Sequence, residues 1–422
     1  MRYNIFSGTN CGSECLEAVR SLSGSGPLLD GPDIAAYEAA FAQAAGTRYA
    51  FSLASGRMAL YRLLEALDIG PGDEVILPAY TCVVVPNAIL YRGAVPIYAD
   101  IEPNGFNIDP AQAERRLTPR TKAIIAQHTY GRICDVDALN LLAGRRGIAV
   151  LEDCAHSLGA CHNGKPSGSL SLAAYFSTDH SKVISTSTGG MITTSDEGLA
   201  RRLRALQGET PFLKASRARA ILATFVLEYV LMDPRLYRAG RLAHRLGGML
   251  GLWAYFADEL SLTRPTAYPY PARLSCAQAR LGLSQLRRLE DNLAWRRRSA
   301  ALYHRALTGS ALADDPGHAW LRYTWLVEDR EAWVRLLRPL LDMGIWFTSV
   351  AEGRSRDLRE IGYEPGSCPV AERAASHCVN LPTHPRVLRP ELLAERLAWA
   401  AAEGSGRYRL LATQLPTTGG SR

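Results

Sequence analysis

Two stretches of the sequence decide the fold: residues 150–160, VLEDCAHSLGA, and residues 175–191, YFSTDHSKVISTSTGGM. In the first stretch, a short apolar run ends at acids, as expected where a buried strand ends. Ligands bind at the carboxyl ends of strands in open α/β sheets, so Asp153 either has a functional role or caps the next helix. In the second stretch, hydroxyl side chains and Gly189-Gly190 surround Lys182, and such a setting suits an anionic ligand.

An acid and a lysine in one βα-sized stretch are the pair that pyridoxal 5′-phosphate (PLP) requires. A lysine amine forms a Schiff base with this cofactor, and a carboxylate beside the pyridine nitrogen keeps that nitrogen protonated. Most lysines are solvated surface charges, but the polar and glycine-rich surroundings of Lys182 argue against that interpretation. We therefore predict that Lys182 and Asp153 are catalytic residues of a PLP enzyme.

The same residues resemble the DegT/StrS class of PLP-dependent sugar aminotransferases, which belong to the fold-type I transferases. The lysine motif of the class is matched without a gap, and other landmarks follow in the expected order from about residue 25 to about residue 395. The resemblance implies a large domain with a mostly parallel sheet sandwiched by helices, and a smaller α+β C-terminal domain. The positions that match the two central motifs are residues 152–156, 159–160, 176–177, 182 and 189–191.

The resemblance also implies roles for individual residues. A glycine-containing turn at residues 54–60 opens a helix whose N-terminal N–H groups would receive the cofactor phosphate. His156 would contact the phenolic oxygen of the ring. Substrate contacts are expected from Tyr80 and from His128, for which a purely structural role is equally compatible with the sequence. The predicted cofactor-binding residues are Ser55, Gly56, Arg57, Cys82, Asp153, His156, Ser177, Lys182 and Arg273.

Four positions depart from the usual pattern of the class. Cys82 stands where an aromatic residue commonly stacks on the pyridine ring, Arg57 where threonine is common, and Thr188 where an acid is common. Pro271 replaces an asparagine that a partner subunit usually lends, whereas Arg273 keeps the arginine two residues later. These departures leave open a non-catalytic sensor that retains the fold.

The resemblance implies an activity that transfers an amino group from L-glutamate or L-glutamine to a nucleotide-linked keto-sugar or to a cyclitol. Such a reaction belongs to polysaccharide or natural-product biosynthesis. Some relatives carry histidine in place of the lysine and are sugar dehydratases. Here Lys182 occupies the decisive position and His180 lies two residues earlier, so transamination is preferred to dehydration. The resemblance further implies a homodimer with a shared active site.

Length and composition are those of an ordinary globular protein with two domains, which we place at residues 1–262 and 263–422. Nine cysteines form no metal-binding pattern, so we expect no metal site and reduced thiols in the cytoplasm. No secretory signal is recognisable at the N-terminus. The net charge of +7 arises from arginines spread over helical stretches, which does not favour a nucleic-acid partner.

The segment 207–262 is longer and more apolar than the usual connection between the domains. Residues 221–232 form an apolar helix of roughly 18 Å, which is short of the roughly 30 Å of a hydrocarbon core. Residues 235–253 have the pattern of an amphipathic helix. Three roles remain open for residues 211–262: a dimer-interface or lid helix pair, a membrane-surface contact, and extra core.

Overall fold

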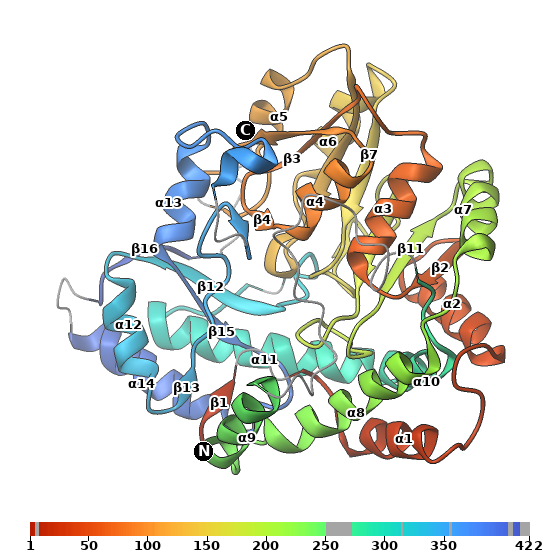
Figure 1. The fold of residues 1–422 in the computed structure, drawn as a ribbon. Helices are drawn as coiled ribbons and strands as arrows, with labels where there is room; N and C mark the ends of the chain where they lie inside the picture. The colour runs from red at the N-terminus through yellow and green to blue at the C-terminus, as the bar shows by residue number, and fades with distance from the viewer. Residues whose placement is uncertain are drawn as a thin grey trace.

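The computed structural model describes residues 1–4, 8–103, 105–249, 272–313, 315–353, 357–403 and 408–413. Its centre is a seven-stranded sheet with the strand order β2-β11-β10-β7-β6-β3-β5 (Figure 1). β11 runs antiparallel to both of its neighbours, whereas the other adjacent strands are parallel. The predicted α/β class with a mostly parallel sheet is confirmed. The strands are β2 (Tyr49–Leu53), β3 (Glu74–Pro78), β5 (Val95–Ala99), β6 (Thr121–Gln127), β7 (Ala149–Asp153), β10 (Ala173–Ser177) and β11 (Gly190–Thr194).

Helices cover both faces of this sheet. Successive strand residues point to opposite sides, so each strand contributes side chains to both faces. Ile124 and Val150 pack with the helices on one face, and Ile125 and Leu151 pack with those on the other. This two-sided burial explains why the central strands are almost continuously apolar. The first face is covered by α5 (Pro110–Arg115) and α6 (Val136–Gly144), and the second by α3 (Gly56–Ala66), α4 (Val84–Tyr91) and α7 (Glu197–Glu209).

The C-terminal part is built on an antiparallel sheet of three strands in the order β15-β12-β16. Helix α11 packs against α14 beside it, and the short strand β1 of the N-terminus joins this part by pairing with β13. The elements are β1 (Tyr3–Asn4), α11 (Leu289–Thr308), β12 (Arg322–Val327), α12 (Arg330–Leu337), β13 (Leu341–Asp342), α13 (Pro369–His377), β15 (Cys378–Pro382), α14 (Pro390–Glu403) and β16 (Leu410–Thr413).

Residues 276–308 form two helices, α10 (Cys276–Leu286) and α11, in place of one continuous helix. The backbone leaves the helical region at Arg288, with φ −112° and ψ 14°. This break lets α10 pack against α2 (Pro32–Ala44), while α11 packs against α14. The predicted boundary between residues 262 and 263 lies outside the described residues, so the division into two domains stays a prediction.

Two helices form the described part of the insertion: α8 (Ala215–Leu231) and α9 (Tyr237–Met249), while residues 250–262 lie outside the described residues. Leu222 and Phe225 of α8 are fully buried against α10 and against Ala18 of α1 (Gly12–Leu22), so the inner face of α8 adds core. Among the described helices, none combines the length and the apolar character needed to span a bilayer.

The remaining elements are short. β4 (Thr81–Cys82) pairs in parallel with β14 (Ala351–Glu352), and this pairing attaches the C-terminal part to the chain that follows β3. β8 (Cys161–His162) and β9 (Lys165–Pro166) form a hairpin. The 3₁₀ helices are Thr129–Gly131 and Leu358–Ile361.

Candidate active site

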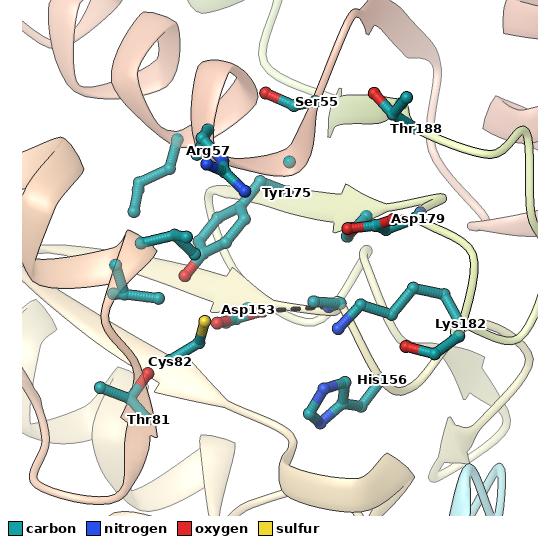
Figure 2. Close-up of a pocket in the computed structure, with 18 of the residues that line it drawn as sticks. Ser55, Arg57, Thr81, Cys82, Asp153, His156, Tyr175, Asp179, Lys182 and Thr188 are labelled. Atoms are coloured by element: carbon teal, nitrogen blue, oxygen red, sulfur yellow. Dashed lines mark hydrogen bonds between the residues drawn. The ribbon is translucent and has the colours of Figure 1, made fainter. Parts of the chain in front are cut away.

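A cavity of about 260 Å³ lies at the carboxyl ends of β7 and β10, beside the N-terminus of α3 (Figure 2). Residues from both the large sheet and the C-terminal part line it. Eight of the nine predicted cofactor-binding residues meet there, and their individual roles stay predictions. These eight residues are Ser55, Gly56, Arg57, Cys82, Asp153, His156, Ser177 and Lys182.

The N-terminus of α3 forms one wall of the cavity. Ser55 is the N-cap residue, and its Oγ accepts a hydrogen bond of 3.3 Å from the N–H of Met58. The first N–H groups of a helix have no partner within the helix, and they attract anions. A Cβ on Gly56 would lie 2.9 Å from the Cβ of Ser177. The glycine therefore lets Ser177 approach the helix end, and the two elements together form a cradle suited to a phosphate.

Gly190 is a second position where the backbone comes too close for a side chain. A Cβ there would lie 2.3 Å from the carbonyl oxygen of Ser55. We expect Gly190→Ala to lower the free energy of unfolding by about 1–3 kcal/mol, because the strand and the helix must move apart. Gly144→Ala, at an open position on α6, is the matched control. Urea unfolding of both variants tests this, and equal stabilities would contradict it.

Asp153 is the last residue of β7, and it is the acidic residue predicted for the site. Its side chain is buried, and its Oδ1 accepts a hydrogen bond of 3.0 Å from the N–H of Ala155. Burial raises the pKa of this carboxyl above its usual value. Figure 2 shows the carboxylate beside the Cys82 thiol, with Lys182 reaching toward the same space. A cationic group bound in the cavity would therefore be stabilised by ionised Asp153.

Lys182 lies in the loop between β10 and β11. Burial lowers the pKa of its amine, which favours the neutral, nucleophilic form. Its Nζ lies 5.0 Å from the centre of the Trp346 ring, and the guanidinium of Arg322 lies 3.9 Å from that ring. Trp346 and Phe347 reach the cavity from the C-terminal part, and no sequence motif marked either of them.

His156 stands on the side of the cavity near Lys182 (Figure 2). Its Nδ1 accepts a hydrogen bond of 3.2 Å from the N–H of Tyr130, so the proton of the neutral ring is on Nε2. Burial lowers the pKa of the imidazole well below its usual value, and the ring therefore stays neutral. It is stacked against Trp346 with 6.0 Å between ring centres. A neutral imidazole of this tautomer can donate a hydrogen bond to a ligand oxygen.

Two expected substrate contacts, His128 and Tyr80, are not among the residues that line the cavity. Both side chains are fully buried, and the Tyr80 hydroxyl bonds that of Tyr130 at 2.8 Å. The adjacent residues Gln127 and Thr81 line the cavity instead, joined by a hydrogen bond of 2.6 Å. Neighbours in extended chain point to opposite sides, which explains why the adjacent residues face the cavity, and the substrate contacts of Tyr80 and His128 stay predictions.

The His128 ring lies in a polar cluster inside the large domain. Its Nε2 is 3.0 Å from Glu152, and Cys154 is close enough that the three side chains have the spacing of metal ligands. The oxygens of Glu152, however, accept hydrogen bonds from the backbone N–H groups of residues 168, 170 and 171. These bonds account for the buried carboxylate as a structural anchor for the chain before β10.

Arg273 is the ninth predicted cofactor-binding residue, and it is not among the residues that line the cavity of its own chain. Its guanidinium is 4.3 Å from the centre of the Phe212 ring, and its N–H bonds the carbonyl of Pro211. Pro271, at the position of the partner's asparagine, lies outside the described residues. The cofactor contact expected of Arg273 stays a prediction.

Asp179 and His180 form an ion pair at the cavity that the sequence analysis did not single out. Asp179 lines the cavity, and its Oδ1 lies 2.7 Å from Nδ1 of His180. Burial alone would lower the pKa of His180. The Asp179 carboxylate nevertheless raises this pKa to about 9, and Glu228 of α8 acts in the same direction. The loop that carries Lys182 is thereby coupled electrostatically to the insertion.

The stability contribution of this ion pair depends on pH. The folded-state pKa of His180 is about 9, and the unfolded value is about 6.5. The contribution is therefore complete below about pH 6.5 and is lost as the pH rises through about 9. We expect the stability advantage of the wild type over His180→Gln, measured by urea unfolding, to shrink between pH 7 and pH 10. The control His377→Gln, on α13, should show no such trend, and a constant advantage would contradict the pairing.

The chain resembles known proteins over most of its length. The profile of the DegT/DnrJ/EryC1/StrS aminotransferase family matches residues 10–216 and 230–393, and residues 217–229 between the two matched segments lie within α8. The chain is 31% identical over 387 residues to the spore coat polysaccharide biosynthesis protein SpsC of Bacillus subtilis, covering 89% of this chain and 90% of that protein.

Two further relatives extend over the same length. Identity is 30% over 385 residues to the dTDP-3-amino-3,6-dideoxy-alpha-D-galactopyranose transaminase of Aneurinibacillus thermoaerophilus, covering 90% of this chain and 92% of the relative. The fold is similar to that of the aminotransferase TlmJ from Streptoalloteichus hindustanus, with a TM-score of 0.73, 26% identity, and coverage of 95% and 99%. The chain therefore belongs to the DegT/DnrJ/EryC1/StrS aminotransferase family.

Proposed function

We propose that the protein is a PLP-dependent aminotransferase. It transfers an amino group from L-glutamate or L-glutamine to a nucleotide-linked keto-sugar or to a cyclitol. One observation carries this proposal: the amine of Lys182, the carboxylate of Asp153 and the N-terminus of α3 meet in one cavity. The sugar-nucleotide transaminase among the relatives supports a sugar acceptor.

The residues of the cavity fit the cofactor at both of its ends. The N–H groups of α3 with Ser55, Ser177 and Arg57 would hold the phosphate, and His156 would donate a hydrogen bond to the phenolic oxygen. Asp153 would hold a proton on the ring nitrogen, because a buried carboxylate is stabilised by a cationic partner. The cradle at Gly56 and Gly190 leaves space for backbone donors and none for added side chains.

When bound, PLP supplies an electron sink that acidifies the hydrogen on the α-carbon of the amino donor. Lys182 anchors the cofactor and then, as a free amine, takes that proton and returns it at the second carbon of the exchange. The lowered pKa of Lys182 increases the neutral fraction of the amine, which is the form that accepts a proton. The aromatic surface of Trp346 and Phe347 lines the cavity and helps to exclude water from the reacting atoms.

A half-reaction with the purified holoprotein tests this function. L-Glutamate without acceptor should convert the cofactor from its aldehyde to its amine form and release one equivalent of 2-oxoglutarate per chain. A subsequent addition of keto-sugar nucleotides should restore the aldehyde form and yield an amino sugar. A deoxygenated sugar in place of an amino sugar would indicate a dehydratase, and a cofactor that no amino donor converts would indicate a sensor.

We infer further that the protein is a homodimer in which Arg273 reaches the cavity of the partner. Arg273 is not among the residues that line its own cavity, where the other eight predicted residues meet, and this supports the arrangement. Co-expression of Lys182→Met with Arg273→Ala chains should then recover about a quarter of the wild-type activity, because half of the dimers contain one intact site. Activity equal to the mean of the two separate variants would contradict a shared site.

A further inference from the structure

Exposed apolar side chains are concentrated on the insertion. Fourteen large apolar side chains are exposed among the described residues, and six of them lie on α8, on α9 and on the turn between these helices. So high a share on two helices differs from the scattered single residues of an ordinary surface. We call this set the α8–α9 apolar face: Leu227, Val230, Leu236, Leu242, Leu246 and Met249.

The orientation of α9 is set by close packing on its opposite side. Tyr237 is buried, and a Cβ on Gly240 would overlap the carbonyl oxygen of Leu231 at 1.8 Å, so the backbone of α9 contacts the end of α8. The hydroxyl of Tyr237 donates a hydrogen bond to Asp342 of β13. With this side turned inward, the residues at positions 242, 246 and 249 share the outward face of the helix.

The charge around the apolar face is strongly positive. Residues 211–249 contain seven Lys or Arg and two Asp or Glu, a net charge of +5 out of +7 for the chain. Within α9 there is no acidic residue, and Arg238, Arg241 and Arg245 flank the apolar stripe. Arg241 bonds Asp342 at 2.7 Å, whereas Arg238 and Arg245 form no ion pair with any described residue. An occupant of this face should thus be apolar at its centre and anionic at its edge.

A second copy of the chain does not have that chemistry. A pair of α9 helices related by two-fold symmetry would bring arginines together with no acid of α9 between them, which is unfavourable. The proposed dimer contact through Arg273 also lies far from α9. Arg273 packs beside Phe212, which precedes α8 in the chain, whereas α9 follows α8. The 17 residues of α8 separate the two ends by about 25 Å. Figure 1 shows α8 running along the lower edge of the molecule from α1 to α9.

We propose that the α8–α9 apolar face binds an anionic phospholipid surface. Helix α9 lies in the plane of the headgroups, the side chains of Leu242, Leu246 and Met249 enter the acyl boundary, and Arg238 and Arg245 contact lipid phosphates. Neither α8 nor α9 is able to span the bilayer, so the association is peripheral. This surface does not include the residues of the cavity, and its function is therefore separable from catalysis.

Vesicle flotation of the holoprotein tests this proposal. We expect binding to vesicles of phosphatidylcholine with phosphatidylglycerol, and at least about 10-fold weaker binding to phosphatidylcholine alone, with a loss at high salt. The triple variant Leu242→Ser/Leu246→Ser/Met249→Ser and the double variant Arg238→Ser/Arg245→Ser should each lose binding by a similar factor. Controls of equal chemistry are Leu141→Ser, which is 61% exposed on α6, and Arg335→Ser/Arg373→Ser.

Two outcomes would overturn the proposal. One is wild-type protein that floats with neither kind of vesicle. The other is a loss of molecular mass in light scattering for the triple serine variant without a change in flotation, because a second copy of the chain would then cover the face. The double arginine variant keeps the apolar stripe, so it tests the charge contribution even where the triple variant does not fold. Retained cofactor and circular dichroism verify the fold of each variant.

Discussion

Replacement of Lys182 by methionine is expected to lower the rate of amino transfer by at least about 10³-fold, because one side chain is both the covalent anchor and the proton carrier. Methionine is unbranched and of similar length, so the loop between β10 and β11 should keep its packing against Trp346. The phosphate cradle at α3 does not include Lys182, and the variant should still bind PLP without the colour of the covalently bound form. Lys165→Met, on the exposed hairpin strand β9, is the matched control.

Borohydride reduction locates the covalent bond directly. Peptide mass spectrometry of the reduced wild-type holoprotein should find the cofactor on Lys182, and the Lys182→Met protein should carry none. Activity close to wild type in the variant, or a reduced adduct on another lysine, would remove the basis for the assignment of the whole cavity.

Asp153→Asn is expected to lower kcat by about 10²–10³-fold, in the range observed when one preorganised electrostatic contact is removed from an active site. The amide oxygen of asparagine can still accept the hydrogen bond from the N–H of Ala155, so the end of β7 should keep its conformation. What is lost is the charge that keeps the ring nitrogen protonated. The measurement is kcat at saturating PLP, with Asp137→Asn, at a side chain 68% exposed on α6, as the control.

The two variants have different expected signatures, which separates the roles of the two residues. The Asp153→Asn protein should still form the covalent bond through Lys182 and should still be trapped by borohydride, while its proton transfers are slow. The Lys182→Met protein should bind the cofactor without that bond. An Asp153→Asn protein with unchanged kcat would falsify the role of this carboxylate and leave the role of Lys182 intact.

Position along the sequence was enough to predict most of the cavity, because its central residues are close together in the chain. Asp153 and Ser177 end two neighbouring strands, and His156 and Lys182 follow them in the chain, so their spacing in sequence carries over into space. The substrate contacts of Tyr80 and His128 stay predictions. The sequence identified the strand ends but could not determine which of two adjacent residues faces the cavity, and the structure places Thr81 and Gln127 there.

The sequence by itself therefore determined the α/β class and marked Asp153, Lys182 and the turn at residues 54–60, since each depends on a pattern within a few residues. Only the tertiary structure decided which distant segments join them. It brought Trp346 over Lys182, linked the Asp179 and His180 pair to α8, and packed Arg273 against Phe212. It also separated a buried face of α8 from the exposed α8–α9 apolar face. The reason is physical: the burial and the partners of a side chain are set by the segments packed against it, and the pattern of its own segment does not contain them.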